Sequence, residues 1–247
     1  MERHKKKLIM NNTVAIVQAR MDSTRFPAKV MRCIGNTPLI EILLRRLNQS
    51  ERIDKIILAT SYNLENQSMI EHVRNLGFHV YVGSENDVLD RYYQAALAFK
   101  AKSVVRITGD CPLIDPTLVD RIIEKFEADQ IDYVENQNPP TYPDGLDTEV
   151  FSFAALEIAW IEAKTHHERE HVTPYFYTSN KFQLGEFENP QDLSSLRWTV
   201  DYKEDLELVR KIVRLIPNRP ILMENILDLF SKYPKLKKIN QDFAMKL

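Results

Sequence analysis

The sequence predicts an α/β fold built on a doubly wound, mostly parallel sheet with a small inserted arm. Short apolar runs of strand composition alternate with helical segments through the first half of the chain, a spacing typical of parallel sheets covered by helices. The chain has 247 residues, and its 44% hydrophobic content is enough to bury a sizeable core. We therefore expect a single domain over residues 13–247.

Four apolar runs in the first half are predicted to be strands. The first, VAIVQ, begins with the composition of a buried parallel strand. Strands are expected over residues 14–18, 55–59, 78–82 and 103–107, and helices over 39–48, 64–75, 87–99 and from 115 to about 128. Thr37 and Pro38 predict the start of the first helix, with Thr37 as its cap, and Gly77 is expected to end the second.

The alternation breaks after Tyr133. Residues 136–145, NQNPPTYPDG, contain three prolines and a glycine and are expected to form a loop. Beyond this loop we expect strands over residues 148–153, 182–188 and 196–200, and helices over 154–164, 168–177, 202–215 and 224–232. Residues 136–192 are predicted to be an excursion from the sheet and not a second domain.

Composition excludes several classes of protein. The formal net charge of −2 argues against a general binder of polyanions such as nucleic acid, so a cationic site must be local. Cys33 and Cys111 match no metal or redox spacing and are expected to be free thiols in a reducing cytoplasm. No apolar run resembles a membrane span or a signal peptide. Residues 1–12 are basic and patternless, Met10 offers an alternative start, and we expect a mobile extension there.

A cationic loop follows the first predicted strand. It contains Arg20, Arg25 and Lys29, with the hydroxyls of Ser23 and Thr24 between them. Open α/β folds bind nucleotides at the carboxyl ends of their strands, and guanidinium and ammonium groups hold phosphates. The loop is therefore predicted to hold a triphosphate. The alternative is a solvated basic turn.

Two aspartates follow apolar runs, Asp110 shortly after residues 104–107 and Asp201 directly after 196–200. Magnesium prefers oxygen ligands and usually takes one or two carboxylates together with phosphates. If the two strand ends meet, Asp110 and Asp201 suit metal-assisted phosphoryl transfer. The alternative for Asp110 is a turn or helix cap. Asp115 is expected to cap the helix that starts at Pro116, and Asp205 to have a structural role in a first helical turn.

These segments resemble the acylneuraminate/KDO cytidylyltransferase family of sugar nucleotidyltransferases, and most closely its spore-coat-polysaccharide branch. The family pattern A-R-x-x-S-x-R-x-P-x-K is matched at Ala19, Arg20, Ser23, Arg25, Pro27 and Lys29. The chain departs from it with Gln18 where many relatives have proline and with no glycine in the loop. The G-D-x-P-L-I metal motif begins at Gly109, and Asp201 and Asp205 match I-D-x-x-x-D-L. The resemblance implies a Rossmann-like, nucleotide-diphospho-sugar transferase fold.

The resemblance also implies roles on the nucleotide side. The implied catalytic residues are Arg20, Lys29, Asp110 and Asp201, with Mg²⁺ held by Asp110 and Asp201. The implied nucleotide-binding residues are Gln18, Ala19, Arg20, Ser23, Arg25, Lys29, Thr60, Ser61, Arg91, Thr108 and Asp110. Ser61 stands where relatives often have aspartate, and Arg91 has the alternative of a solvated helix residue.

Two further segments resemble sugar-side elements of the spore-coat branch. Asp147 and Glu149 lie in a G-x-D-x-E-V pattern, and Arg169 and His171 in R-E-H-V-T-P-Y. Arg169 is expected to pair with a sugar carboxylate; the alternative is that these residues only hold the insertion together. The insertion is also expected to mediate a homodimer, since it is rich in aromatic residues. These are Tyr142, Trp160, Tyr175, Phe176, Tyr177, Phe182 and Phe187.

The implied activity is transfer of CMP from CTP to an acidic sugar or sugar phosphate, giving a nucleotide-sugar and pyrophosphate. A GT-A-like glycosyltransferase is the main alternative, and a nucleotide-sensing protein without activity is another. Residues 167–171 also spell H-E-x-x-H, the zinc-protease signature. We disfavour zinc because Pro174 disturbs the helix at once and no third ligand is evident. His167 and His171 are instead expected to serve the sugar.

Overall fold

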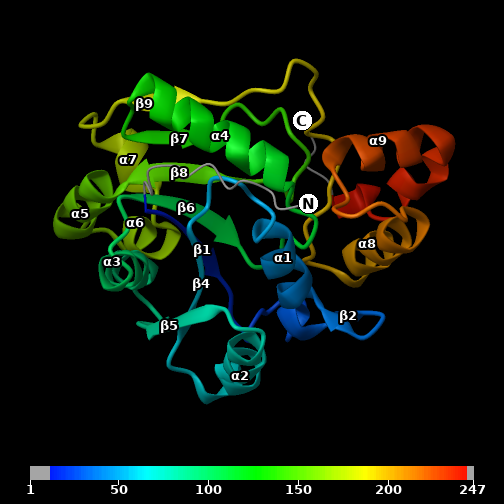
Figure 1. The fold of residues 1–247 in the computed structure, drawn as a ribbon, viewed down its shortest axis with the longest axis horizontal. Helices are drawn as coiled ribbons and strands as arrows, with labels where there is room; N and C mark the ends of the chain where they lie inside the picture. The colour runs from blue at the N-terminus through cyan, green and yellow to red at the C-terminus, as the bar shows by residue number, and fades with distance from the viewer. Residues whose placement is uncertain (1–11, 244–247) are drawn as a thin grey trace, which may run out of the picture.

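The computed structural model describes residues 12–243, and its centre is a mostly parallel sheet of seven strands (Figure 1). The strand order is β5-β4-β1-β6-β8-β7-β9. The strands are β1 (Thr13–Gln18), β4 (Lys55–Ser61), β5 (His79–Gly83), β6 (Ser103–Thr108), β7 (Tyr133–Glu135), β8 (Glu149–Ser152) and β9 (Leu184–Glu186). Only β8 runs antiparallel to its neighbours. The predicted α/β class with a mostly parallel sheet is confirmed.

β1 is the central strand of the parallel part. Its residues 14–17 are fully buried, as their apolar composition predicts. β4 pairs with one edge of β1 and β6 with the other, so that Gln18 lies beside both Ala59 and Thr108. The carboxyl ends of three strands therefore meet at one edge of the sheet, where each passes into a polar loop.

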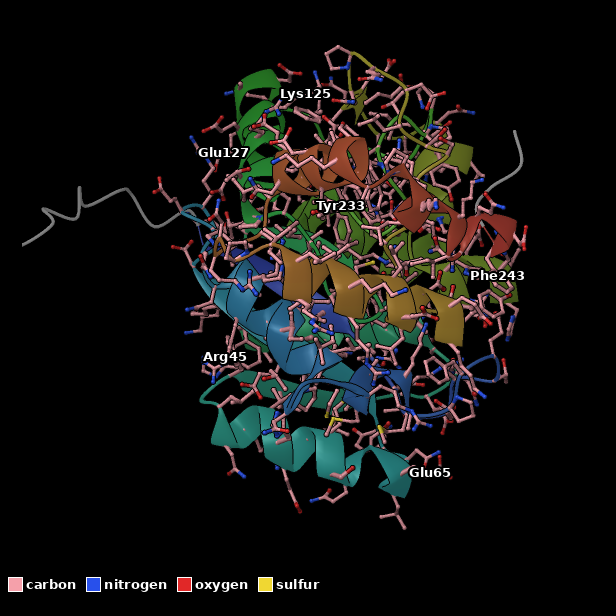
Figure 2. The ribbon with its side chains drawn as sticks, turned by 90° about the vertical axis from the view of Figure 1, so that its right-hand side faces the viewer. Arg45, Glu65, Lys125, Glu127, Tyr233 and Phe243 are labelled. Carbon is pink, nitrogen blue, oxygen red and sulfur yellow. The ribbon has the colours of Figure 1, made fainter. Side chains whose placement is uncertain are left out.

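Helices cover both faces of the sheet and enclose two hydrophobic clusters. One face carries α1 (Leu39–Leu47), α2 (Gln67–Asn75), α4 (Pro116–Asp129), α8 (Lys203–Leu215) and α9 (Met223–Lys232). The other carries α3 (Val88–Ala98), α5 (Phe153–Glu162), α6 (His166–His171) and α7 (Pro174–Thr178). Charged side chains such as Arg45, Glu65 and Lys125 point outward from these layers (Figure 2). No described helix is long and apolar enough to cross a bilayer.

Side chains at helix starts explain several boundaries. Asp115 Oδ1 accepts from the backbone N–H of Thr117 at 2.9 Å, so the predicted cap of α4 is confirmed. Asp87 caps α3 in the same way through the N–H of Asp90. Residues 12–243 also contain the short 3₁₀ turns η1 (Lys29–Met31), η2 (Leu64–Asn66), η3 (Pro234–Lys238) and η4 (Gln241–Phe243).

Two local predictions are wrong. Thr37 does not cap α1, because Thr37–Pro38 forms β3, which pairs with β2 (Cys33–Ile34), and the helix begins only at Leu39. Residues 196–200 are buried but are not a strand of the sheet. They make an isolated bridge from Asp144 to Arg197, and the N–H of Val200 donates to the carbonyl of Asp110 at 2.8 Å. The run is apolar because it is buried, and a buried segment need not pair in a sheet.

Residues 136–192 are not an excursion from the sheet, since they contribute β8 between β6 and β7 and β9 at the edge. The helix predicted over residues 168–177 is divided into α6 and α7, because Val172 has a φ of 72° and interrupts the helical backbone. Residues 1–11 of the predicted mobile extension lie outside the described residues. The sugar-binding and dimerisation roles of the insertion remain predictions.

Candidate active site

The cationic loop and the end of β6 share one cavity of about 230 Å³. Its walls come from the end of β1, the loop that follows, η1 and the turn after β6. The lining residues are Gln18, Ala19, Arg20, Ser23, Thr24, Arg25, Lys29, Val30, Thr108, Gly109 and Asp110. The structure thus brings together all the residues predicted for the phosphate loop and Asp110.

Gly109 allows the ends of β1 and β6 to approach closely. Its N–H donates to the carbonyl of Gln18 at 2.8 Å. A Cβ atom at position 109 would lie 2.6 Å from the Cβ of Ala19 and 2.9 Å from the carbonyl oxygen of Gln18. Any larger residue would push the turn that carries Asp110 away from the cationic loop.

Lys29 connects the two predicted metal carboxylates. Its Nζ lies 2.7 Å from Asp110 Oδ2 and 2.7 Å from Asp201 Oδ1. Burial lowers the pKa of Lys29, but the two carboxylates outweigh burial and raise it above its usual value. Burial likewise opposes ionisation of Asp110, and Lys29 outweighs it and lowers the Asp110 pKa. Lys29 and Asp110 are therefore both charged at neutral pH.

The same geometry fits a divalent cation. Two carboxylate oxygens from different segments converge on the position of Lys29 Nζ, beside a cavity lined by cationic and hydroxyl side chains. Oxygen ligands of this kind and number suit Mg²⁺, which completes its shell with phosphate oxygens and water. Asp110 and Asp201 are therefore able to hold the ion that the sequence predicts.

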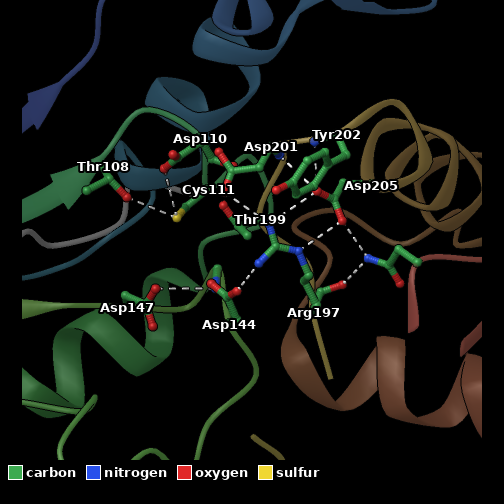
Figure 3. A network of polar contacts seen from close by, with 12 residues as sticks. Thr108, Asp110, Cys111, Asp144, Asp147, Arg197, Thr199, Asp201, Tyr202 and Asp205 are labelled. Carbon is green, nitrogen blue, oxygen red and sulfur yellow. Dashed lines mark hydrogen bonds and ion pairs between the residues drawn. The ribbon is translucent and has the colours of Figure 1, made fainter. Parts of the chain in front are cut away.

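Arg197 contacts the candidate site and was not identified in the sequence analysis. Its guanidinium forms ion pairs with Asp144, with Asp201 at 3.0 Å and with Asp205 at 3.1 Å, and its side chain is only 9% exposed (Figure 3). The ion pairs outweigh burial and raise the pKa of Arg197. The one signal in the sequence was the four-residue spacing of Arg197, Asp201 and Asp205.

Asp205 fixes the turn that carries Asp201. It is fully buried, and its Oδ2 accepts from the backbone N–H of Asp201 at 2.9 Å and from that of Tyr202 at 3.0 Å. The structural role predicted for Asp205 fits these contacts. Arg25 reaches the same turn, with its Nη2 2.9 Å from Asp201 Oδ1.

Thr60 and Ser61 lie at the end of β4, and Arg91 lies on α3 with its side chain beside Gly83 at the end of β5. Arg91 is only 2% exposed, so it is not a solvated helix residue. Burial lowers its pKa, and nearby Arg20 adds to this. Several buried polar atoms here have no described protein partner, namely Gln18 Oε1, Thr60 Oγ1 and Arg91 Nε.

Asn66 is a second residue that the sequence analysis missed. Its Nδ2 donates to Ser61 Oγ at 2.9 Å, and its Oδ1 accepts from the N–H of Met21 at 2.9 Å. Asn66 thereby connects the turn after β4 to the loop after β1. Arg20, in contrast, is half exposed and pairs with Asp22 at 3.3 Å.

Of the four predicted sugar-side residues, Asp147 lines a second cavity among the described residues. This second cavity has a volume of about 190 Å³ and is lined by Asn136, Gln137, Pro140, Tyr142, Asp144, Asp147 and Ser194. Burial, reinforced by Asp144, raises the pKa of Asp147 to about 8. Figure 3 shows Asp144 between Asp147 and Arg197, so this cavity adjoins the Arg197 ion-pair network.

The other three sugar-side residues are not gathered with Asp147. Glu149 is buried and bonded to Arg106, Tyr133 and Thr173. Arg169 donates to Asp87 through Nε at 2.9 Å and Nη2 at 2.6 Å, so its guanidinium is already paired. His171 is exposed and lies against His167, with ring centroids 4.6 Å apart. Their roles toward a sugar remain predictions.

The H-E-x-x-H segment has no metal-site geometry. Glu168 Oε2 caps the start of α6 by accepting from the N–H of Thr165 at 2.9 Å. Within residues 12–243, no group of three His, Cys, Asp or Glu side chains is placed to hold a metal ion. This geometry gives no support to the zinc-protease alternative.

The chain is similar to known proteins over nearly its whole length. The sequence model of the cytidylyltransferase family matches residues 14–243. An uncharacterized protein of Methanocaldococcus jannaschii is 38% identical over 236 residues, which are 94% of this chain and 96% of that protein. The spore coat polysaccharide biosynthesis protein SpsF of Bacillus subtilis is 33% identical over 234 residues, 91% of this chain and 96% of SpsF.

A solved structure is similar over nearly its whole length. It is that of a cytidylyltransferase from Leptospira borgpetersenii, which is 29% identical. The TM-score is 0.89, and the match covers 96% of this chain and 99% of that one. The likeness therefore includes the insertion as well as the parallel part of the sheet.

Proposed function

The chain belongs to the cytidylyltransferase family and is a nucleotidyltransferase, and on this premise we propose that it transfers CMP from CTP to an acidic sugar or sugar phosphate. The products would be an activated nucleotide-sugar and pyrophosphate, for surface polysaccharide or glycan biosynthesis. The observation that carries this proposal is the position of Lys29, between Asp110 and Asp201 and beside the cationic cavity.

Different residues in and around the cavity would bind different parts of the nucleotide. Arg20, Arg25 and Lys29 would bind the triphosphate oxygens, assisted by the hydroxyls of Ser23 and Thr24. Thr60, Ser61 and Arg91 would hold the base and ribose, with Gln18 and Thr108 at the strand ends between them. The unpartnered Gln18 Oε1, Thr60 Oγ1 and Arg91 Nε support this division.

Asp110 and Asp201 would hold Mg²⁺, which when bound would neutralise phosphate charge and orient the α-phosphate. Arg197 keeps Asp201 in place and supplies positive charge behind it. A sugar hydroxyl would form the new bond to the α-phosphorus in line as the bond to the β-phosphate oxygen breaks. The cationic side chains would stabilise the charge that develops on the departing pyrophosphate.

The acceptor would lie on the side of Asp147, with Glu149, Arg169 and His171 as further sugar-side residues. The resemblance of these segments to the spore-coat branch supports this, as does the likeness to SpsF, whose name refers to spore coat polysaccharide biosynthesis. Binding of a sugar carboxylate by Arg169 would require exchange of its present partner, Asp87. Family membership favours this reaction over that of a GT-A-like glycosyltransferase.

We also propose that the protein is a homodimer and that it acts in the cytoplasm. Most aromatic residues of the insertion pack within the chain, but Ile161, Tyr177 and Leu184 are 55%, 46% and 46% exposed. These residues on α5, α7 and β9 offer apolar surface to a second copy. The cytoplasm supplies CTP, and Cys33 and Cys111 are unpaired thiols as expected there. A monomeric mass in light scattering at micromolar concentration would exclude the dimer.

The proposal is tested by measuring pyrophosphate release from each of the four nucleoside triphosphates. Each is combined with Mg²⁺ and a panel of sugar acids, sugar phosphates and neutral sugars. We expect release with CTP and a sugar acid or sugar phosphate only. Release with another nucleotide, or with neutral sugars alone, would contradict it, and consumption of a nucleotide-sugar without pyrophosphate would support the glycosyltransferase.

A further inference from the structure

The C-terminal segment after α9 reaches the candidate active site. Leu236 and Ile239 of this segment pack against the hydrophobic core on the α4 face of the sheet. Asn240 and Phe243 instead contact the turn around Asp201. Neither residue was singled out by the sequence, and neither has a role in the reaction described above.

Asn240 anchors the segment to this turn. It is only 4% exposed, and its Nδ2 donates to Asp205 Oδ1 at 2.8 Å and to the carbonyl of Arg197 at 3.0 Å. Asp205 in turn holds the backbone N–H of Asp201. The chain is therefore fixed against the metal-side turn three residues before Phe243.

Phe243 stacks on Tyr202, with ring centroids 4.1 Å apart and an angle of 20° between the planes. Tyr202 follows Asp201 directly and also lies beside Arg25, whose Cζ is 5.7 Å from the centre of the Tyr202 ring. Phe243 belongs to neither hydrophobic core cluster. Among the described residues its ring contact is therefore with Tyr202, beside Asp201, and not with the core.

Arg25 needs such support because little else holds it. Its side chain is 56% exposed, and its ion pair is with Asp201. A long, exposed side chain loses rotamer freedom when it binds a ligand, and holding it in the bound position beforehand lowers that cost. A Tyr202 ring fixed by Phe243 restricts the guanidinium to the side of the cavity.

We infer that Phe243 is a positioning residue for the nucleotide site, acting through Tyr202 to hold Arg25 at the triphosphate cavity. The inference rests on the proposed function, since it takes the cavity as the site of CTP. It assigns the C-terminal segment a role in ligand binding that a purely structural tail would not have.

The test is CTP binding, measured by calorimetry with Mg²⁺ and without an acceptor. Phe243→Ala should raise the Kd for CTP roughly 3- to 10-fold, the scale of one aromatic contact, while Phe243→Tyr should stay within about twofold of wild type because it keeps the ring. Phe243→Leu keeps apolar bulk without the ring, so it should bind as weakly as Phe243→Ala and replaces it if alanine impairs folding. Tyr233→Ala is the matched control, since Tyr233 is exposed, lies just before η3 and is well separated from Phe243 (Figure 2).

A double-mutant cycle with Arg25→Ala tests whether Phe243 affects CTP binding through Arg25. If Phe243 acts through Arg25, Phe243→Ala should have almost no further effect on the Kd in the Arg25→Ala background. Equal losses in both backgrounds, or unchanged CTP affinity in Phe243→Ala and Phe243→Leu, would overturn the inference while leaving the proposed function intact. Wild type that fails to bind CTP would refute the proposed function and the inference with it.

Discussion

Lys29 Nζ lies 2.7 Å from Asp110 Oδ2, although the two residues are 81 positions apart in the sequence. The same nitrogen reaches Asp201, 172 positions away, at the same distance. One ammonium group therefore joins the cationic loop to both carboxylate-bearing segments. These charges serve the fold as well as the proposed chemistry.

Lys29→Met should lower both the turnover and the stability of the protein. Turnover should fall by on the order of a hundredfold or more, the scale for losing one contact to transition-state charge. The free energy of unfolding should fall by about 1–3 kcal/mol, because the buried Asp201 and the partly buried Asp110 lose their shared partner. Mg²⁺ should raise the Tm of the variant more than that of wild type, since the ion would restore the missing positive charge. Thermal unfolding with and without Mg²⁺ measures this.

Lys125→Met is the control for Lys29, because Lys125 pairs with Asp129 on the surface of α4. Its stability should change by no more than about 0.5 kcal/mol. Equal Mg²⁺ stabilisation of wild type and Lys29→Met would show that the ion does not bind between the two carboxylates.

Arg20→Ala should lower turnover without lowering stability. Arg20 lines the cavity, but it is half exposed and pairs only locally with Asp22. We expect turnover to fall on the order of a hundredfold with a Tm close to that of wild type. Arg74→Ala, which removes an exposed arginine of α2, should change neither. Unchanged kinetics in Arg20→Ala would support the alternative that the loop is a solvated basic turn.

The parts of the site predicted from the sequence depend on local signals. β1, the cationic loop and the Asp115 cap each lie within a few residues of the pattern that indicates them. The convergence of Arg20, Lys29 and Asp110 on one cavity then follows from a general property of parallel sheets, whose strand ends share an edge.

The missed parts depend on contacts between distant segments. Arg197 meets Asp144 across 53 positions, and no local pattern indicates that pairing. β7 is three residues long, too short to show a period. A strand was predicted over residues 148–153, but its place between β6 and β7, as β8, could not be read locally. Residues 196–200 were wrongly predicted to be a strand. Their apolar run is buried, but it makes an isolated bridge and no ladder of hydrogen bonds.

Gly109→Ala should disturb the site through the backbone. The new Cβ would meet Ala19 Cβ at 2.6 Å and the Gln18 carbonyl oxygen at 2.9 Å. We expect a lower Tm and slower pyrophosphate release, because the turn that carries Asp110 must move. Adding Ala19→Gly removes the shorter of the two clashes and should restore part of both losses. A fully active and stable Gly109→Ala protein would show that the close approach of the strand ends is not needed.

Asp147→Asn should change the pH dependence of stability. Burial and Asp144 raise the pKa of Asp147 from its ordinary 3.8 to about 8. Between these values the folded chain keeps a proton that the unfolded chain has lost, so this group costs stability progressively as pH rises from about 4 to 8. Asn carries no such cost. We therefore expect the variant to gain stability relative to wild type across this range, with the difference constant above it.

The gain at pH 8 should be about 1 kcal/mol or more, since one pKa unit corresponds to about 1.4 kcal/mol. Urea unfolding at several pH values measures it, and Asp228→Asn, on the exposed side of α9, should show no such trend. A pH-independent difference between Asp147→Asn and wild type would mean that Asp147 ionises normally in the folded chain.

The most direct test of the central claim is pyrophosphate release from CTP and Mg²⁺ by Asp110→Asn and Asp201→Asn, with an acceptor that wild type uses. The claim is that these two carboxylates form one metal-binding centre for CMP transfer. Both variants should remain folded, because asparagine keeps the shape of each side chain, and both should lose nearly all turnover. Near-normal release by either folded variant would contradict the claim.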